Sequence, residues 1–280
     1  MVPKESVVRF GFFLVKFDFV IRKPCDNIHN ILGGINLFIY IIRCSNRDNA
    51  MGSLAEQTLE NLNNRRKSEY PFEAQHPLGL RMRRLLSWYE RGLIESEDAD
   101  AQFIFCWIAF NSAYGVDESD RIINKQGPVR ELVRQEEFFD KVITLDRQQK
   151  IRRLLQEKIF DSIQNILENE YIYRAFWLYE KGEERFATWL ETLESQQVRV
   201  AKAYRQNNIK FILNTLFERL YVLRNQLLHG GATFRGIANR SQVEDGAKVL
   251  MALLPIIAEL MMDGPEVNWG EPPFPLIKPI

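Results

Sequence analysis

The chain has 280 residues, which is enough for one large domain or two small ones with a sizeable hydrophobic core. Its 46% hydrophobic and 26% charged residues are ordinary for a globular protein and exclude disordered and fibrous classes. The 37 basic residues equal the 37 acidic ones. Binding to nucleic acid would therefore have to rest on a local basic patch, because general affinity for polyanions scales with the phosphates neutralised.

Three cysteines, Cys25, Cys44 and Cys106, follow neither disulfide nor zinc-site spacing, which predicts a reducing, cytoplasmic location. No spacing of acidic residues marks a metal site, and Walker and dinucleotide-binding glycine motifs are absent from the sequence. We therefore expect no metal and no cofactor. The best apolar run, 31–42, is shorter than the roughly twenty residues that cross a bilayer, so we also expect no membrane span.

The first fifty residues differ from the rest of the chain. They contain seven Lys and Arg residues against four Asp and Glu residues, lack a clear helical period, and are broken by Pro24 and by Gly33-Gly34. Two interpretations stay open. Either translation starts at Met51 and residues 1–50 come from an over-extended gene assignment, or these residues form a small β-rich or hairpin-like extension.

From Met51 onward the apolar spacing predicts an all-α protein, with one helical domain over 51–265 and an irregular, proline-rich tail over 266–280. Glycine is expected to end two helices, at Gly92 and Gly115, and a proline, Pro128, to begin another. Ser241 followed by Glu244 predicts a capping box. The expected helices are 54–67, 78–91, 95–114, one from 128, 146–166, 170–181, 184–205, 208–229 and 241–262.

The helix expected over 208–229 carries an apolar stripe and has three polar residues of interest near its end: Arg224, Asn225 and His229. The planar donor fork of arginine fits phosphate oxygens, and asparagine can both donate and accept hydrogen bonds. A five-residue step rotates by about 140° on a helix, so Arg224 and His229 converge only if the helix ends or distorts near His229. Gly230-Gly231 would allow such an ending.

The segment from Arg224 to His229 is similar to the Arg-X4-6-His motif of the HEPN superfamily (higher-eukaryote and prokaryote nucleotide-binding), with Asn225 in the polar position that commonly follows the arginine. Residues 105–115 resemble the first core helix of prokaryotic members. The His-Gly-Gly ending resembles the branch that includes ApeA-like proteins. The resemblance covers roughly residues 100–262. A tyrosine that marks the branch silenced by nucleotidylation is replaced here by Gly231, so control by a paired nucleotidyltransferase is not expected.

The resemblance implies an antiparallel HEPN-like helical bundle with additional helices, which dimerises and places two Arg/His pairs in one shared cleft. It implies metal-independent endoribonuclease activity through attack by the RNA 2′-hydroxyl. His229 would transfer protons, Arg224 would stabilise charge on the phosphate, and Asn225 would orient Arg224 or the substrate. Asn111 is a weaker candidate for a supporting contact to the substrate. Such an enzyme would act as a toxin or an anti-phage effector, with RNA, a second copy, and an antitoxin or regulatory protein as partners.

Two alternatives stay open: a catalytically silent HEPN module that binds RNA, nucleotide or a protein, and a helical interaction protein with a chance motif. The aromatic residues over 171–189 are interpreted as packing, with base stacking as the alternative. The basic clusters over 65–67, 81–84 and 147–153 are interpreted mostly as solvated helix faces, one of which could guide RNA.

Overall fold

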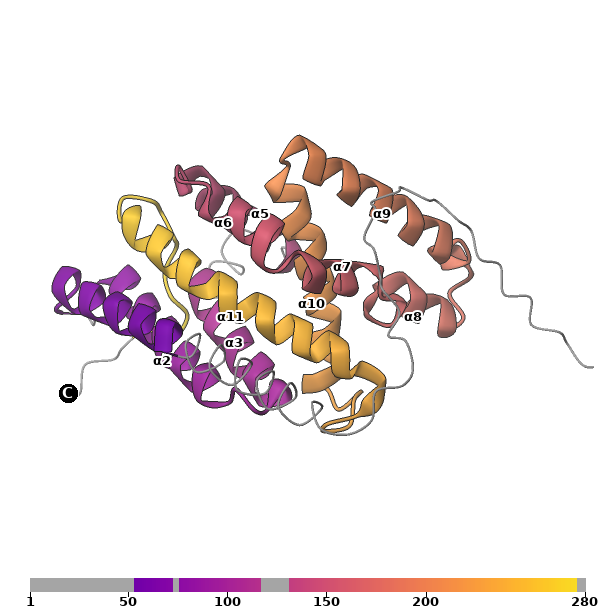
Figure 1. Ribbon diagram of the computed structural model, residues 1–280, viewed down its shortest axis with the longest axis horizontal. Coiled ribbons are helices and arrows are strands. Elements are labelled where there is room, and N and C mark those ends of the chain that lie inside the picture. Colours follow the sequence, from indigo (N-terminus) through magenta and orange to yellow (C-terminus); the bar gives the residue numbers. More distant parts are fainter. Residues whose placement is uncertain (1–52, 73–75, 117–130, 276–280) are drawn as a thin grey trace, which may run out of the picture. The chain divides into compact units, whose positions relative to one another are not determined.

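The computed structural model describes residues 53–72, 76–116 and 131–275 (Figure 1). Every regular element in these ranges is helical, which confirms the all-α prediction. Both interpretations of residues 1–50, and the helix start expected at Pro128, lie outside the described residues. Among the residues that are described, no helix has the length and apolarity needed to span a membrane.

The helices follow the predicted order, although their ends differ. The helix over 53–69 comes first. The others are α2 Pro77–Ile94, α3 Ala99–Tyr114, α5 Glu131–Leu145, α6 Lys150–Arg153, α7 Phe160–Glu168, α8 Arg174–Glu180, α9 Trp189–Gln206, α10 Ile209–Leu228 and α11 Arg240–Asp263. Short 3-10 turns occur at η3 Glu170–Ile172, η4 Glu184–Phe186 and η5 Ile237–Asn239. The single helix expected over 146–166 is α6 and α7, joined by a π-helical segment, η2 Leu154–Lys158.

Two predicted helix signals are wrong. Gly92 does not end α2, which continues to Ile94. A Cβ atom at Gly92 would lie 2.7 Å from the Sγ of Cys106, so this glycine allows close packing of α2 on α3. Ser241 does not begin the last helix, because α11 starts at Arg240 and its N-cap, Asn239, makes no side-chain capping bond.

Helix α11 lies between the α2–α3 pair and the segment that contains α5 and α7 (Figure 1). Close approach in its first third depends on Gly246, because a Cβ atom there would lie 2.9 Å from Phe103 on α3 and 3.2 Å from Leu223 on α10. Helix α10 packs against α5, α7 and α9. Aromatic rings join α3 and α5 to α10: the centre of the Phe217 ring lies 4.5 Å from that of Phe110 and 4.7 Å from that of Phe139.

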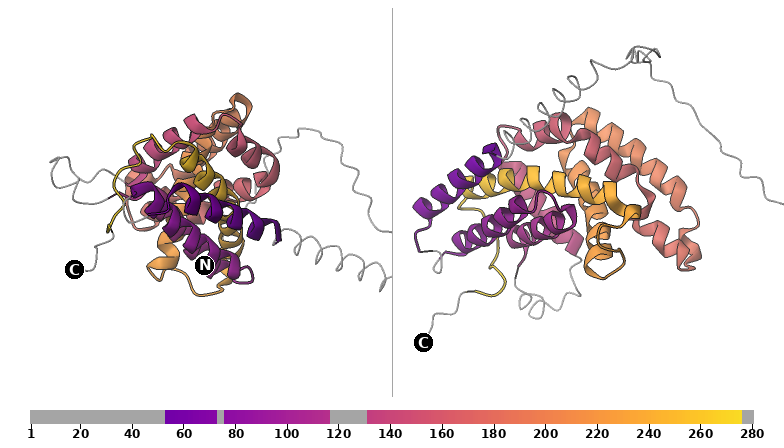
Figure 2. Two further views of the ribbon diagram at one scale, coloured as in Figure 1. Left: turned by 90° about the vertical axis from the view of Figure 1, so that its left-hand side faces the viewer. Right: turned by 60° about the horizontal axis from the view of Figure 1, so that its bottom comes forward.

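Helices α3 and α10 run in opposite directions. Trp107 packs against Tyr221, with ring centres 6.4 Å apart, and the later residue Phe110 packs against the earlier residue Phe217. The C-terminal end of α10 therefore lies beside the first half of α3. The connection from α10 to α11 leaves the bundle there, as Figures 1 and 2 show in orange and gold.

The interpretation of residues 81–84 as a solvated face is wrong for Arg81 of α2, because its side chain is completely buried. Its Nη1 donates to the carbonyl oxygens of Ala113 (3.1 Å) and Gly115 (2.6 Å), at the end of α3. Its Nη2 donates to the carbonyl oxygen of Gly270 at 3.1 Å. Arg81 thus satisfies carbonyls that a helix end leaves without partners and fastens the C-terminal tail to the bundle. Burial lowers the pKa of Arg81 to about 10.

We predict that Arg81→Met lowers the free energy of unfolding by about 3 kcal/mol, because several buried carbonyls lose a charged donor together. Arg83→Met changes an exposed residue of the same helix and should alter it by no more than about 0.5 kcal/mol. Urea unfolding of both variants measures the difference. Equal stability of the two variants would contradict the structural role of Arg81.

Candidate functional site

Helix α10 ends one residue before His229, which occupies the C-cap position. The backbone N–H of His229 donates to the carbonyl oxygen of Asn225 at 3.1 Å. Gly230 has a φ of +71°, a left-handed conformation that glycine adopts without strain and that commonly terminates helices. The N–H of Ala232 then bonds to the carbonyl oxygen of Gln226 at 3.0 Å and turns the chain away. The prediction that the helix ends at His229 is confirmed.

Arg224 is half-buried near the end of α10. Its Nη1 donates to the Oδ1 of Asn225 at 2.9 Å, and its guanidinium carbon lies 5.9 Å from the centre of the Tyr221 ring. Its Nε is buried and has no hydrogen-bond partner among the described residues. No carboxylate in the described ranges pairs with Arg224, so its guanidinium keeps donors free for an anion.

His229 is exposed, in contrast to Arg224. Across the described ranges, no interaction joins the His229 ring to the Arg224 guanidinium. The structure therefore brings the Arg224 and Asn225 side chains together. The His229 side chain is exposed to solvent at the helix end.

Asn111 lies on α3 next to Phe110, and its Oδ1 is buried without a partner among the described residues. Phe110 packs on Phe217 of α10, so the neighbouring Asn111 lies beside the Phe217 turn of that helix. Phe217 is two turns, or roughly 10 Å, from Arg224 along α10. The structure does not bring Asn111 to the Arg224 end.

Gln226, which belongs to no predicted site, ties the end of α10 to two other segments. Its Nε2 donates to the carbonyl oxygen of Tyr171 in η3 at 2.7 Å. Its Oε1 accepts from the Nδ2 of Asn239 in η5 at 3.2 Å. Both partners are distant in sequence, so no local pattern could have indicated this role.

Asp100 holds the connection between α10 and α11 against the start of α3. Its buried carboxylate accepts a hydrogen bond from Nη1 of Arg240 at 2.7 Å and from the backbone N–H of Arg235 at 3.3 Å. The hydrogen bond to Asp100 raises the pKa of Arg240. Asp98, the N-cap of α3, lies 3.6 Å from the Arg235 guanidinium. The segment that follows His229 is thereby fixed at Arg235 and at Arg240, the first residue of α11.

We predict that Asp100→Ala destabilises the protein by about 1–3 kcal/mol, because Arg240 loses a charge-assisted bond in a partly buried place. Hydrogen–deuterium exchange should accelerate over residues 229–239 first. Glu97→Ala, at an exposed position in the preceding turn, should leave the exchange pattern unchanged. Unaltered exchange over 229–239 in Asp100→Ala would contradict the anchoring role.

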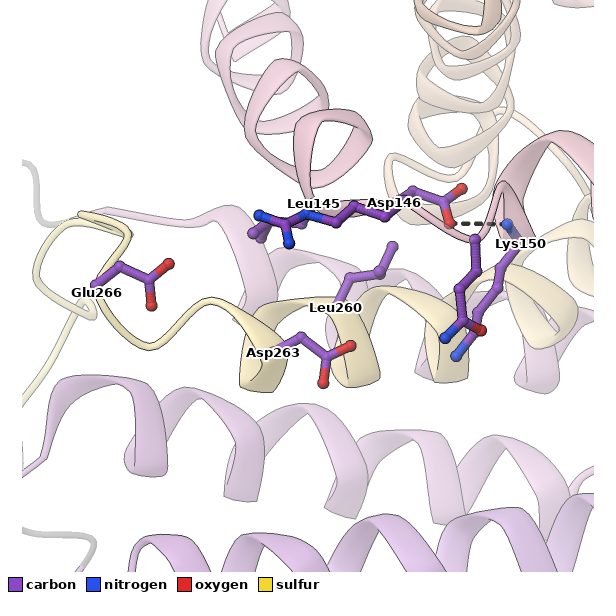
Figure 3. Close-up of a pocket in the computed structure, with 8 residues that line it drawn as sticks. Leu145, Asp146, Lys150, Leu260, Asp263 and Glu266 are labelled. Carbon is purple, nitrogen blue, oxygen red and sulfur yellow. Dashed lines mark hydrogen bonds between the residues drawn. The ribbon is translucent and has the colours of Figure 1, made fainter.

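A cavity of about 230 Å³ lies at the far end of α11 (Figure 3). It is lined by Leu145, Asp146, Arg147, Gln148, Lys150, Leu260, Asp263 and Glu266. The carboxylate of Asp146 accepts from the backbone N–H of Lys150 at 2.7 Å, and Asp263 pairs with Arg65 at 2.7 Å. Gly246, which packs near Leu223 beside the motif, and Leu260 in the cavity wall are 14 residues or about 21 Å apart along α11, so the two sites are separate. No group of residues in the described ranges is suited to hold a metal ion.

Comparison with family models, with curated proteins and with solved structures found no match for this chain.

Proposed function

We propose that the chain is a metal-independent endoribonuclease of the HEPN type, with Arg224 and His229 as its catalytic residues. The observation that supports this most directly is the burial and hydrogen bonding of the Arg224 guanidinium. Its guanidinium is half-buried at the end of a helix, keeps donors free of any described carboxylate, and lies close in sequence to an exposed imidazole. An all-helical bundle agrees with the proposal.

The chemistry requires only these side chains and the RNA itself. The 2′-hydroxyl attacks the adjacent phosphorus, the bond to the 5′-oxygen breaks, and the products carry a 2′,3′-cyclic phosphate and a 5′-hydroxyl. His229 transfers a proton from the attacking hydroxyl or to the leaving oxygen. Arg224 stabilises the negative charge that develops on the phosphate oxygens. Asn225, bonded to Arg224, orients the guanidinium.

The described residues show no interaction between the Arg224 and His229 side chains of one chain, which agrees with a site completed by a second copy. In the proposed homodimer, two helix ends meet and each pair faces one shared cleft. We further propose that the enzyme is cytoplasmic and acts on host or phage RNA as a toxin or defence effector, held in check by an antitoxin or regulatory protein.

A catalytically silent HEPN module that binds RNA, nucleotide or a protein is the second candidate. The equal number of acidic and basic residues favours it. Binding of RNA without cleavage would distinguish this module from the nuclease.

We predict that the purified protein cleaves transfer RNA in excess EDTA and leaves cyclic-phosphate ends, because no step requires a metal ion. Arg224→Ala and His229→Ala should each lower the rate by at least about 100-fold, as expected when transition-state stabilisation or proton transfer is lost. Product ends are identified by mass spectrometry of the fragments.

Arg205→Ala and His76→Ala serve as matched controls. Arg205 is exposed at the end of α9, and His76 caps α2 through a bond to the N–H of Gly79. Both control variants should cleave at the wild-type rate. Equal cleavage by Arg224→Ala, His229→Ala and the wild type would place the active site elsewhere or reveal a contaminant.

A further inference from the structure

One face of α9 carries charges that are symmetric in position and opposite in sign about the centre of the helix. Each residue of a helix turns by about 100°, so Glu191, Glu194, Lys202 and Arg205 all lie within about 40° of Val198. The two glutamates stand seven and four residues before Val198, and the two basic residues stand four and seven residues after it. All four charged side chains are exposed, and within the described ranges none of them forms an ion pair.

This face of α9 points away from the rest of the bundle. The buried residues of the helix lie about 140–160° around its axis from Val198: Leu193, Val200 and Ala203. Gln196, on that same buried side, bonds to Arg219 of α10. Val198 itself is 67% exposed. Figures 1 and 2 show α9 at the outer edge of the described helices, so its charged face is open to a partner.

The helix dipole accounts for only part of this charge pattern. It favours acidic residues in the first turn of a helix and basic residues in the last turn, and its effect falls off beyond them. Glu191 and Arg205 lie in these end turns, whereas Glu194 and Lys202 lie nearer the centre. The dipole also gives no reason for an exposed, apolar Val198 between the two pairs of charges. Pairing with a surface of matching charge explains both features.

We propose that α9 is an interface between two copies of this chain, packed antiparallel about a two-fold axis that passes beside Val198. Such an axis sets each residue opposite the one that lies equally far on the other side of the centre. Glu191 therefore faces Arg205 of the partner subunit, Glu194 faces Lys202 of the partner subunit, and the two valines pack on each other. A parallel pairing would set like charges against each other, so the pattern selects the antiparallel one.

The contact is expected to be weak and sensitive to salt. A single helix from each copy is a small surface beside the roughly 1,000 Å² of a stable interface, and salt screens exposed ion pairs. The inference does not rest on the proposed nuclease, because this face of α9 points away from α10, which carries Arg224. A chain that uses both this contact and the shared cleft would assemble beyond a dimer.

Oxidative cross-linking of the full chain tests the geometry. Cys25→Ser and Cys44→Ser remove two native thiols, and the third, Cys106, is buried. Val198→Cys or Leu190→Cys is then added, both at exposed positions of α9. Antiparallel helices with axes about 8–10 Å apart bring the two 198 positions within disulfide range but keep the two 190 positions about 24 Å apart. Val198→Cys should therefore form a covalent dimer at least about 10-fold faster than Leu190→Cys.

Charge reversal tests the pairing of the side chains. In the Val198→Cys background, one variant carries Glu191→Lys with Glu194→Lys, and another carries Lys202→Glu with Arg205→Glu. Each variant alone sets like charges against each other and should cross-link at least about 10-fold more slowly than its parent. An equimolar mixture of the two has opposite charges at all four contacts and should recover the parent rate. Recovery also shows that both variants are folded.

Glu56→Lys with Glu60→Lys is the matched control, because it makes the same change of charge on two exposed residues of the helix over 53–69. This control should cross-link at the parent rate. Equal rates for Val198→Cys and Leu190→Cys, a rate unchanged by 0.5 M salt, or a mixture that does not recover would each overturn the interface. RNA cleavage is assayed with the same preparations, so loss of this contact and failure of the proposed nuclease are recorded separately.

Discussion

The ending of α10 at Leu228 is the constraint on which the rest of the candidate site depends. The buried side chains of Leu216, Leu220 and Leu223 fix the rotation of the helix in the bundle. The polar residues Arg224 and Asn225 then fall at the edge of the buried face. The left-handed turn at Gly230 stops the helix before His229, and the imidazole lies exposed at the helix end.

Long-range polar contacts hold this ending in place. Asp100 fixes the chain that leaves His229, and Gln226 fixes the helix itself against η3 and η5. A buried polar group that loses its hydrogen-bond partner costs free energy, so these contacts hold the segment in one position. A site that needs a guanidinium and an imidazole in fixed places requires this segment to keep one position.

Local signals were sufficient to predict the order of the helices and the stop of α10, because the 3.6-residue apolar period and a glycine after the last turn act within a few residues. They failed where the decisive neighbour is distant in sequence. Gly92 resembles a helix stop, but it faces Cys106 on α3. Arg81 resembles a surface residue, but its partners are carbonyls of α3 and of Gly270 in the tail.

The same limit applies to the candidate site. Arg224 and Asn225 are adjacent, so their pairing is a local property that the sequence could indicate. The placement of Asn111 depends on the direction and register of α3 against α10, and these are set by packing of Phe110 on Phe217. The contact between Gln226 and Tyr171 likewise requires the whole fold.

In the proposed mechanism the RNA itself supplies the nucleophile, and a single modified RNA substrate tests this step. A cleavage position is mapped on a short RNA, and the single 2′-hydroxyl next to that bond is replaced by hydrogen. The proposed mechanism predicts that cleavage at this bond disappears while neighbouring cleavage continues. Continued cleavage at the deoxy-substituted bond would show that water attacks the phosphate, and it would contradict the mechanism assigned to Arg224 and His229.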